Sequence, residues 1–377
     1  KVKSDINMAD ASYSLFEGRE HFEHRRVLAV RDREEAIAVL EENDQRRVFT
    51  QAADGEEKSV VFLLPGGGAQ YADMGLGLYE TESIYREYMD AGFAVLKDRT
   101  GLDYKKFLFV DDQNIEDVET NLQKPSVQLP LIFLVEYSLA KLWISKGVKP
   151  SALIGHSMGE NTAACLAEVF SFEDGMGLVL LRGQLMDDVP EGGMLAVQLP
   201  AEELRSHLHE KLAMAAINSP ELSVASGTKQ DLDELSRKLT ALNIDITPVR
   251  INIAAHSWLL EGIMKPFGDY LRSIKLTAPK MKFMSNYTGT WIKAEEATDP
   301  EYWVKHLRNT VRFSDGINTL LEEKGRIFLE VGPGNTLGSL TRQNPEAPAQ
   351  RVFSTLRHPK EETNDDSYFY TVFGRLW

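Results

Sequence analysis

A serine between glycines is the residue of this sequence best suited to do chemistry. Gly155-His156-Ser157-Met158-Gly159 has the G-x-S-x-G spacing, follows the apolar run at 152–154 and precedes a helical pattern from Glu160. In that context the hydroxyl of Ser157 is exposed where a strand ends, and the N–H groups that open the helix face a developing negative charge. The pattern predicts a nucleophilic serine, and a strand-to-helix turn with an incidental serine is the alternative.

A serine hydroxyl needs a base to accept its proton, and His256 is the preferred candidate among eight histidines. It ends an apolar stretch, 251–257, whereas most other histidines lie in polar stretches (His21, His24, His207, His209 and His358). His306 is a competitor, and a purely structural core histidine is the alternative for His256. The side chain of His156, inside the pentapeptide, is expected to point away from Ser157.

A second glycine-rich turn, Pro65-Gly66-Gly67-Gly68-Ala69-Gln70, also follows an apolar run. It has neither the Lys-Ser/Thr ending of a phosphate-binding loop nor the G-x-G-x-x-G spacing of a dinucleotide site. Glycines let a backbone N–H approach a ligand closely, so a second donor to an oxyanion is one use of this turn and a plain tight turn is the other.

Alternating strands and helices must position these residues. The apolar run 60–64 is typical of a buried parallel strand, a long helix is predicted from about 129 to 146, and strand 152–155 leads to the helix from 160. This alternation predicts an α/β fold, with a parallel sheet covered by helices on both faces.

An insert interrupts that alternation between 193 and 252. Its predicted order, β-α-β-β-α-β, is that of a small ferredoxin-like subdomain. Towards the N-terminus, helices at 11–18 and 32–42, the second capped by Asp32, flank a short strand at 26–30, and the polar stretch 53–59 is the best domain boundary. The final stretch, 351–377, is expected to wrap another domain.

Composition restricts the partners. The chain has 377 residues and a net charge of −15, which disfavours nonspecific binding to nucleic acid or to anionic membranes. Cys165 is the single cysteine, so an intrachain disulfide and a cysteine-based metal site are excluded, and a cytoplasmic location is expected. No uninterrupted apolar run of about 18 residues predicts a membrane span. The start at Lys1 and the abrupt end at Trp377 suggest a piece of a longer chain.

Several motifs in a fixed order resemble the malonyl-CoA:ACP transacylase family, and most closely the acyltransferase domains of modular polyketide synthases. The motifs are 155–160, the turn at 65–70, Leu181-Arg182-Gly183-Gln184, Ala255-His256-Ser257 and Glu330-Val331-Gly332-Pro333-Gly334. The resemblance implies a ketosynthase–acyltransferase linker domain at 1–57 and a post-acyltransferase linker at 346–377. It also implies a large hydrolase-like α/β subdomain at 58–192 and 253–345, interrupted by the ferredoxin-like subdomain at 193–252.

The resemblance also implies roles for single residues. Ser157 would be acylated, His256 would be the general base, and the backbone N–H groups of Gly67 and Met158 would form the oxyanion hole. Arg182 would bind the free carboxylate of the substrate, because a planar guanidinium matches a carboxylate with two parallel hydrogen bonds. The backbone carbonyl at His306 would orient the base. No metal is implied.

The sequence departs from the family at two positions near the predicted oxyanion hole. Gly67 stands where the family commonly has Gln, although a backbone donor survives that change. Leu129 precedes Pro130 where a Gln is common, and Gln128 is one place earlier. A side-chain contribution to the oxyanion hole is therefore not implied.

The acyl group is indicated by the specificity positions Met158, Ile253 and Ala255. An apolar residue after the nucleophile is common in family members that select malonyl units, whereas Ile253-Ala254-Ala255-His256 matches neither the malonyl nor the methylmalonyl pattern. Malonyl is the preferred prediction. Because Ala255 is small, methylmalonyl or a hydroxy-, amino- or methoxy-substituted malonyl unit is the alternative.

The predicted reaction is a ping-pong transfer. An extender unit would pass from a CoA or carrier thioester to Ser157, and then to the phosphopantetheine thiol of an acyl carrier protein in polyketide biosynthesis. The domain itself would bind no cofactor, because the phosphopantetheine arrives on the carrier. The other expected partner is a neighbouring ketosynthase domain, and no nucleic acid or membrane is expected. The rival functions are a thioesterase-type or esterase-type serine hydrolase and a non-catalytic scaffold.

Overall fold

The chain folds into two compact units, seen in a computed structural model that describes residues 6–20, 22–42, 44–52, 55, 58–111, 115–249 and 251–377. One unit combines Lys1–Lys58 with Glu362–Trp377, and the other is Ser59–Glu361. The predicted boundary at 53–59 lies partly outside the described residues, as do positions 1–5 and 21 of the predicted linker domain and Arg250 of the predicted insert.

The smaller unit is a strand pair with three helices. Its elements are α1 (Met8–Phe16), β1 (His24–Val27), α2 (Arg33–Glu42), β2 (Phe49–Ala52) and α16 (Asp365–Leu376). The strands β1 and β2 are antiparallel, and Asp32 caps α2 as predicted, since its Oδ1 accepts a hydrogen bond of 2.8 Å from the Glu35 N–H. Helix α16 joins this unit through the ring of Trp377, which lies 4.7 Å from the Arg25 guanidinium.

Residues 346–377, predicted to form one linker, are divided between the two units. Residues up to Glu361 belong to the larger unit, because β11 (Val352–Ser354) pairs with its sheet, and only the residues from Glu362 onward belong to the smaller one. Backbone pairing therefore decides the division, and composition alone did not reveal it.

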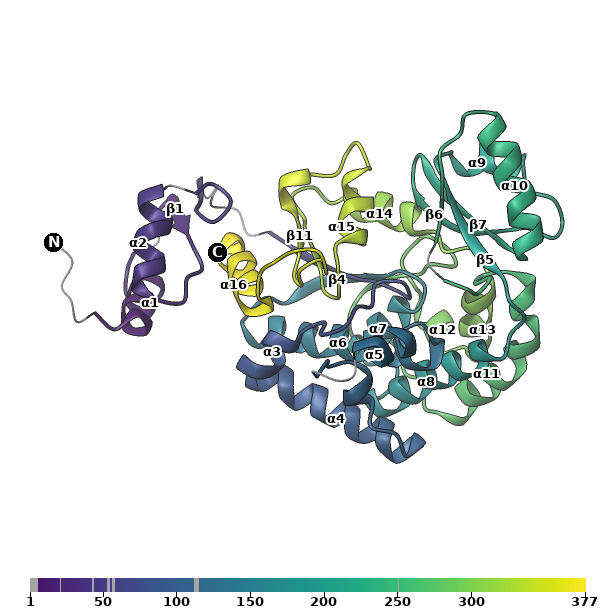
Figure 1. Ribbon diagram of the computed structural model, residues 1–377, viewed down its shortest axis with the longest axis horizontal. Helices are drawn as coiled ribbons and strands as arrows, with labels where there is room; N and C mark the ends of the chain where they lie inside the picture. The colour runs from purple at the N-terminus through teal and green to yellow at the C-terminus, as the bar shows by residue number, and fades with distance from the viewer. Residues whose placement is uncertain are drawn as a thin grey trace. The chain divides into compact units, whose positions relative to one another are not determined.

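A five-stranded sheet organises the larger unit. Its strands are β3 (Val60–Leu64), β4 (Pro150–Gly155), β9 (Phe283–Met284), β10 (Ile327–Glu330) and β11, in the order β11-β10-β3-β4-β9. Every pairing is parallel. Helices lie on both faces, with α14 and α15 on one side of β4 and α6 and α7 on the other (Figure 1). Burial on both faces explains the unbroken apolar runs in β3 and β4.

The described part of the larger unit also contains these helices outside the insert: α3 (Leu76–Thr81), α4 (Ser83–Thr100), α5 (Ile115–Asn121), α6 (Pro125–Ser145), α7 (Gly159–Leu166), α8 (Phe172–Asp187), α11 (Glu261–Ser273), α12 (Ala294–Ala297), α13 (Pro300–Arg308), α14 (Phe313–Leu321) and α15 (Thr336–Arg342). Three 3₁₀ turns accompany them: η1 (Tyr104–Phe107), η2 (Trp258–Leu260) and η3 (Ala349–Arg351).

Helix α6 is longer than the predicted 129–146, because it begins with Pro125 in its first turn, where proline is well tolerated. Among the described residues it is the one helix long and apolar enough to cross a membrane, but 89% of its apolar window is buried inside the protein. It is therefore the core helix of the larger unit.

The insert has the predicted ferredoxin-like order. It comprises β5 (Gly193–Val197), α9 (Ala201–Arg205), β6 (Ala213–Ser219), β7 (Leu222–Gly227), α10 (Lys229–Ala241) and β8 (Ile246–Pro248). The strands form an antiparallel sheet in the order β6-β7-β5-β8, and its two helices cover a leucine-rich core. The backbone of Ile217 on β6 donates to the carbonyl of Val311, which joins this sheet to the large subdomain beside the sheet edge that carries Ser157.

Candidate active site

A tight elbow between β4 and α7 presents Ser157. The serine has a φ of 53°, a left-handed conformation that residues with a side chain rarely adopt. A Cβ on Gly155 would lie 2.0 Å from the Glu160 nitrogen, and a Cβ on Gly159 would lie 2.0 Å from the Leu64 carbonyl oxygen. Both glycines are thus required sterically, Gly155 by the elbow itself and Gly159 by the neighbouring strand β3.

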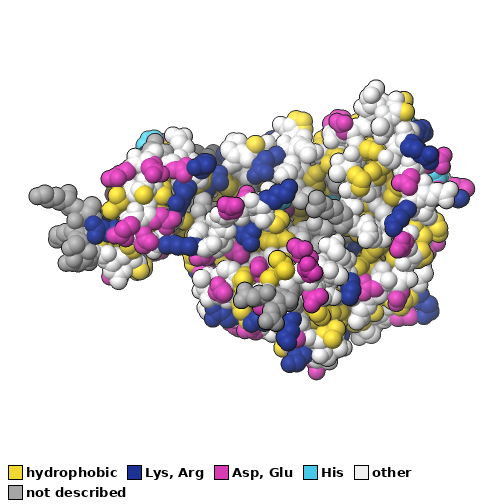
Figure 2. All heavy atoms as spheres, viewed as in Figure 1, with side chains coloured by type: hydrophobic (Ala, Val, Ile, Leu, Met, Phe, Trp, Pro, Cys, Tyr) yellow, Lys and Arg dark blue, Asp and Glu magenta, His cyan; other side chains and the backbone are white. Residues whose placement is uncertain are grey.

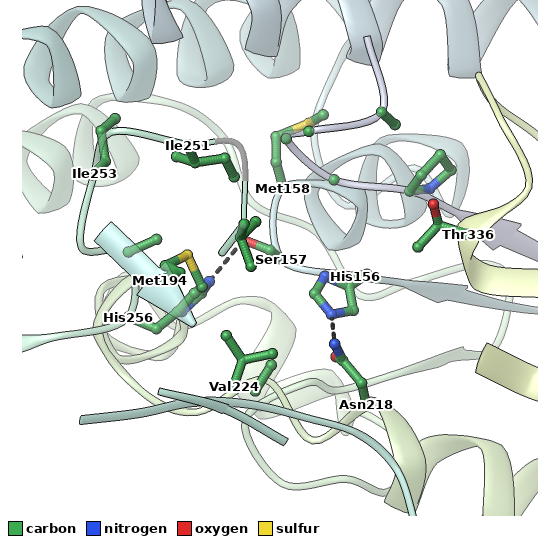
Figure 3. Close-up of a pocket in the computed structure, with 18 of the residues that line it drawn as sticks. His156, Ser157, Met158, Met194, Asn218, Val224, Ile251, Ile253, His256 and Thr336 are labelled. Carbon is green, nitrogen blue, oxygen red and sulfur yellow. Dashed lines mark hydrogen bonds between the residues drawn. The ribbon is translucent and has the colours of Figure 1, made fainter. Parts of the chain in front are cut away.

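The tertiary fold brings Ser157 and His256 into hydrogen-bonding contact, although 99 residues separate them. The Ser157 Oγ lies 2.7 Å from His256 Nε2, and the His256 Nδ1 lies 2.8 Å from the Asn309 carbonyl oxygen. Because a carbonyl only accepts, Nδ1 carries the proton and Nε2 presents its lone pair to the serine. Figure 3 shows this pair, joined by a dashed line, among the residues that line the cavity. Its geometry is that of a nucleophile and its general base.

The carbonyl that orients His256 belongs to Asn309, and the prediction of His306 was wrong. Helix α13 continues through Arg308, and Asn309 follows it with an extended backbone, which turns its carbonyl towards the imidazole. The buried side chain of His306 instead places its Nε2 3.4 Å from Glu160 Oε2. Its ring centroid is 6.4 Å from that of His256, and His256 is the histidine bonded to Ser157.

The surroundings of His256 keep its imidazole neutral. Burial lowers the pKa of His256 well below its ordinary range, and the positive charge of Arg182 and the neighbouring imidazoles of His306 and His156 lower the pKa further. The hydrogen bond to the Asn309 carbonyl acts in the opposite direction. The neutral form is the one that can accept the proton of Ser157.

Arg182, on α8, reaches the nucleophile directly. Its Nη2 donates to Ser157 Oγ at 3.1 Å and its Nη1 donates to Asn161 Oδ1 at 3.0 Å. The side chain is buried, and burial lowers its pKa to about 10, so the guanidinium remains charged at neutral pH. Two donors beside it, Arg182 Nε and Asn161 Nδ2, have no partner among the described residues. This cluster suits an anionic group, and a carboxylate can use several of its N–H donors at once.

The two predicted oxyanion donors lie on neighbouring strand ends. Strands β3 and β4 pair with Leu64 opposite Gly155, and a Cβ on Gly66 would lie 3.4 Å from the Ser157 Cβ. The turn that carries Gly67 therefore adjoins the elbow. Among the described residues, neither the Gly67 N–H nor the Met158 N–H donates to a protein acceptor. Both can therefore donate to a ligand, and their role in an oxyanion hole stays a prediction.

Gln128 does not supply a third donor. Its Nε2 donates to the Gln123 carbonyl oxygen at 3.3 Å, and its buried Oε1 has no partner among the described residues. This Oε1 is the atom near Gly67, 3.4 Å from where a Cβ on that glycine would stand. An acceptor does not stabilise an oxyanion, so the shift of this glutamine by one position along α6 has a chemical consequence.

A cavity of about 360 Å³ lies in front of Ser157, between the large subdomain and the ferredoxin-like sheet. The predicted specificity residues Met158, Ile253 and Ala255 all line it. The small sheet adds apolar residues that the sequence did not single out, among them Met194 and Val224 (Figure 3). One wall of the cavity is thus built by the insert, and its lining is mostly apolar.

His156 occupies the same cavity but plays a different part. Its Nε2 lies 2.8 Å from Asn218 Oδ1 on β6, and Figure 3 shows its ring directed to Asn218 and away from Ser157, as predicted. Burial lowers the pKa of His156. Its hydrogen bond joins the elbow to the ferredoxin-like subdomain. Within the described ranges, no group of three or more His, Cys, Asp or Glu side chains is placed to hold a metal ion.

Sequence reasoning missed three residues that hold this site. Asn161 has a weak signal, since it is a polar residue in the first turn of α7, directly after the elbow. Asn309 acts through its backbone, which side-chain chemistry cannot reveal. Asn286 follows the short strand β9, and its Oδ1 accepts from the Ser157 N–H at 2.8 Å. No motif around it indicated a contact with the elbow.

Comparison with known proteins identifies the class of this site. The family model described as "Acyl transferase domain" matches residues 61–370, and the chain belongs to this family. A second model, "CurL-like, PKS C-terminal", matches residues 1–40. The chain is therefore an acyltransferase, and the elbow serine, its histidine and the buried arginine are its candidate active site.

The similar proteins place the domain more closely. The solved acyl transferase domain of ZmaA is 40% identical, with a TM-score of 0.92 over 99% of this chain and 86% of that one. The corresponding domain of SpnD, solved in complex with 2-(pent-4-yn-1-yl)malonyl, is 34% identical, with a TM-score of 0.89 over 99% and 88%. A component of the phenolphthiocerol/phthiocerol polyketide synthase of Mycobacterium tuberculosis is 33% identical over 98% of this chain, which spans 25% of that protein. The chain is an acyltransferase domain of the modular polyketide synthase type.

Proposed function

We propose that this domain transfers an extender unit, malonyl in the first place, from a CoA or carrier thioester to Ser157 and then to the phosphopantetheine thiol of an acyl carrier protein. The observation that carries the proposal is the convergence of Ser157, His256 and Arg182 on one cavity. A nucleophile, its base and a buried cation are the groups needed to attack a thioester that bears a free carboxylate.

The first half-reaction acylates the enzyme. His256 Nε2 takes the hydroxyl proton as Ser157 Oγ attacks the thioester carbonyl, and the Gly67 and Met158 N–H groups stabilise the oxyanion. The intermediate collapses with cleavage of the carbon–sulfur bond, and the CoA thiolate leaves with the proton from His256. Arg182 holds the carboxylate during both steps, which disfavours acyl groups without one.

The second half-reaction reverses this order. The carrier thiol gives its proton to His256 and attacks the acyl-serine, and Ser157 Oγ leaves and regains the proton. The phosphopantetheine arm belongs to the carrier, so the domain needs no cofactor of its own. Because the net charge is −15, docking of an acidic carrier would depend on Lys and Arg near the mouth of the cavity; Figure 2 shows Lys and Arg interspersed with Asp and Glu over the visible face.

The apolar lining and the identity of Met158 favour malonyl over a polar substituted unit. Ala255 leaves room next to the base, and one methyl group changes recognition in an apolar pocket by only about 1–3 kcal/mol. A substituted malonyl, methylmalonyl first, is therefore the alternative extender unit.

An adduct experiment tests the proposal. The domain is incubated with equal amounts of malonyl-CoA, methylmalonyl-CoA and acetyl-CoA, the intact protein is weighed, and a phosphopantetheinylated carrier is then added. We expect a malonyl adduct on Ser157 that moves to the carrier and is absent from Ser157→Ala. Sustained CoA release without a carrier would instead identify a hydrolase, and the absence of any adduct would identify a scaffold.

A further inference from the structure

A single buried side chain, Asn286, bonds to the first part of the elbow, on either side of His156. Its Oδ1 accepts from the Ser157 N–H at 2.8 Å and its Nδ2 donates to the Gly155 carbonyl oxygen at 2.8 Å. The residue is 1% exposed and follows β9, the neighbour of β4 at the edge of the sheet. The amide thus binds the two consecutive peptide groups that flank His156, immediately before the left-handed residue Ser157.

The backbone of Asn286 is fixed as well. Its N–H donates to Glu160 Oε2 at 2.6 Å, and its carbonyl accepts from the Arg312 N–H at 2.8 Å. The Glu160 carboxylate is fully buried and also contacts the Tyr302 hydroxyl. Because both backbone groups and both side-chain groups of Asn286 have partners, its amide has one stable orientation.

This contact has two consequences for the nucleophile. Ser157 is held at a φ of 53°, a conformation that costs about 1–3 kcal/mol and persists only where its surroundings impose it. In addition, the Ser157 N–H points at Asn286, which leaves the Met158 N–H as the elbow donor that faces the substrate.

We propose that Asn286 is a positioning residue for the acyl transfer: its amide sets the peptide plane before Ser157, and so aims Oγ at His256 and the Met158 N–H at the oxyanion. Asn286 touches no substrate. Its effect should therefore appear in the rate of the chemical step and not in substrate binding.

The test compares Asn286→Ala with Asn344→Ala. Asn344 is also buried, and its side chain bonds to Asn318 and to the Glu346 N–H, but neither contact involves the elbow. The alanine change therefore removes a buried amide with two side-chain hydrogen bonds in both variants, so we expect a similar loss of stability in each. The readouts are Tm, and kcat and KM for acylation of Ser157 by malonyl-CoA in single-turnover experiments.

We expect kcat of Asn286→Ala to fall about 10- to 100-fold with KM within about threefold of the wild type, since a small misplacement of reacting atoms costs that much. Asn344→Ala should lower Tm by a similar amount and keep kcat within about twofold. An equal loss of kcat in both variants would overturn the proposal, and so would an Asn286→Ala variant with a raised KM and an unchanged kcat.

If Asn286→Ala does not fold, Asn286→Asp keeps the volume and the acceptor that faces Ser157 and loses the donor to Gly155. A roughly three- to tenfold lower kcat at unchanged KM is then expected, and a wild-type kcat would refute the role. The inference rests on the proposed function for its assay. A wild-type protein that forms no acyl-serine would refute that function, whereas equal rates in wild type and Asn286 variants refute only the positioning role.

Discussion

Replacing Arg182 by alanine removes the positive charge next to Ser157. In the structure this guanidinium donates to Ser157 Oγ at 3.1 Å and to Asn161 at 3.0 Å, and its Nε has no partner among the described residues. If its purpose is to hold the carboxylate of the acyl group, the variant should lose its preference for carboxylated units over acetyl.

The size of the expected loss of preference follows from the burial of Arg182 and of the carboxylate that it would bind. Each hydrogen bond between charged groups contributes about 1.5–3 kcal/mol, and a buried carboxylate that loses its cation costs about 3–5 kcal/mol. At about 1.4 kcal/mol per factor of ten, the ratio of malonyl to acetyl loading should fall about 100- to 3,000-fold. Arg182→Lys keeps the charge but not the planar pair of donors, so its ratio of malonyl to acetyl loading should lie between those of the wild type and Arg182→Ala.

The assay is competition between malonyl-CoA and acetyl-CoA, read as the two adduct masses on Ser157. Arg326→Ala is the matched control, because Arg326 is also a buried arginine, 6% exposed, and bonds to Glu323 outside the cavity. It should leave the ratio unchanged. If Arg182→Ala still prefers malonyl as strongly as the wild type does, the assignment of Arg182 is refuted.

Three further predictions concern the base, the elbow and the cavity. The acid limb of kcat/KM against pH should lie below pH 6.5, because burial and the Arg182 charge lower the pKa of His256 and only its neutral form accepts a proton. Arg182→Gln should move this limb to higher pH, and a limb at the wild-type pH would contradict the role of the Arg182 charge. Gly155→Ala should abolish acylation and lower Tm, because its Cβ would lie 2.0 Å from the Glu160 nitrogen. Gly262→Ala should change neither, because its Cβ would meet no atom within 4 Å. Normal acylation by Gly155→Ala would refute the steric interpretation. Ala255→Phe should lower methylmalonyl relative to malonyl loading by about 10- to 100-fold in the competition assay, and an unchanged ratio would remove Ala255 from the specificity pocket.

Local sequence patterns predicted the elements that have a local cause. The apolar runs of β3 and β4 indicated buried strands, and the spacing of the glycines at 155 and 159 indicated the elbow. The constraint on Gly155 is local, since its Cβ would meet Glu160, whereas the constraint on Gly159 comes from Leu64 on the neighbouring strand. The order of short strands and helices at 193–252 likewise indicated the ferredoxin-like insert, whose strand pairing the structure shows. The residue at which the last linker passes from one unit to the other was not visible in the sequence, since β11 is held by pairing with β10 in the large sheet.

Candidate residues were therefore accessible from sequence, while their contacts were not. The chain itself determined that a serine would stand at a strand end and that few histidines could serve it. The tertiary structure decided that Asn309 and not His306 orients His256, that Asn286 and not a neighbour in sequence holds the elbow, and that the insert closes the cavity with Met194 and Val224. The physical reason is that a backbone carbonyl or an amide side chain carries no distinctive signature in sequence, and its role depends on direction and distance, which the packing of β9, α13 and the small sheet against the elbow determines.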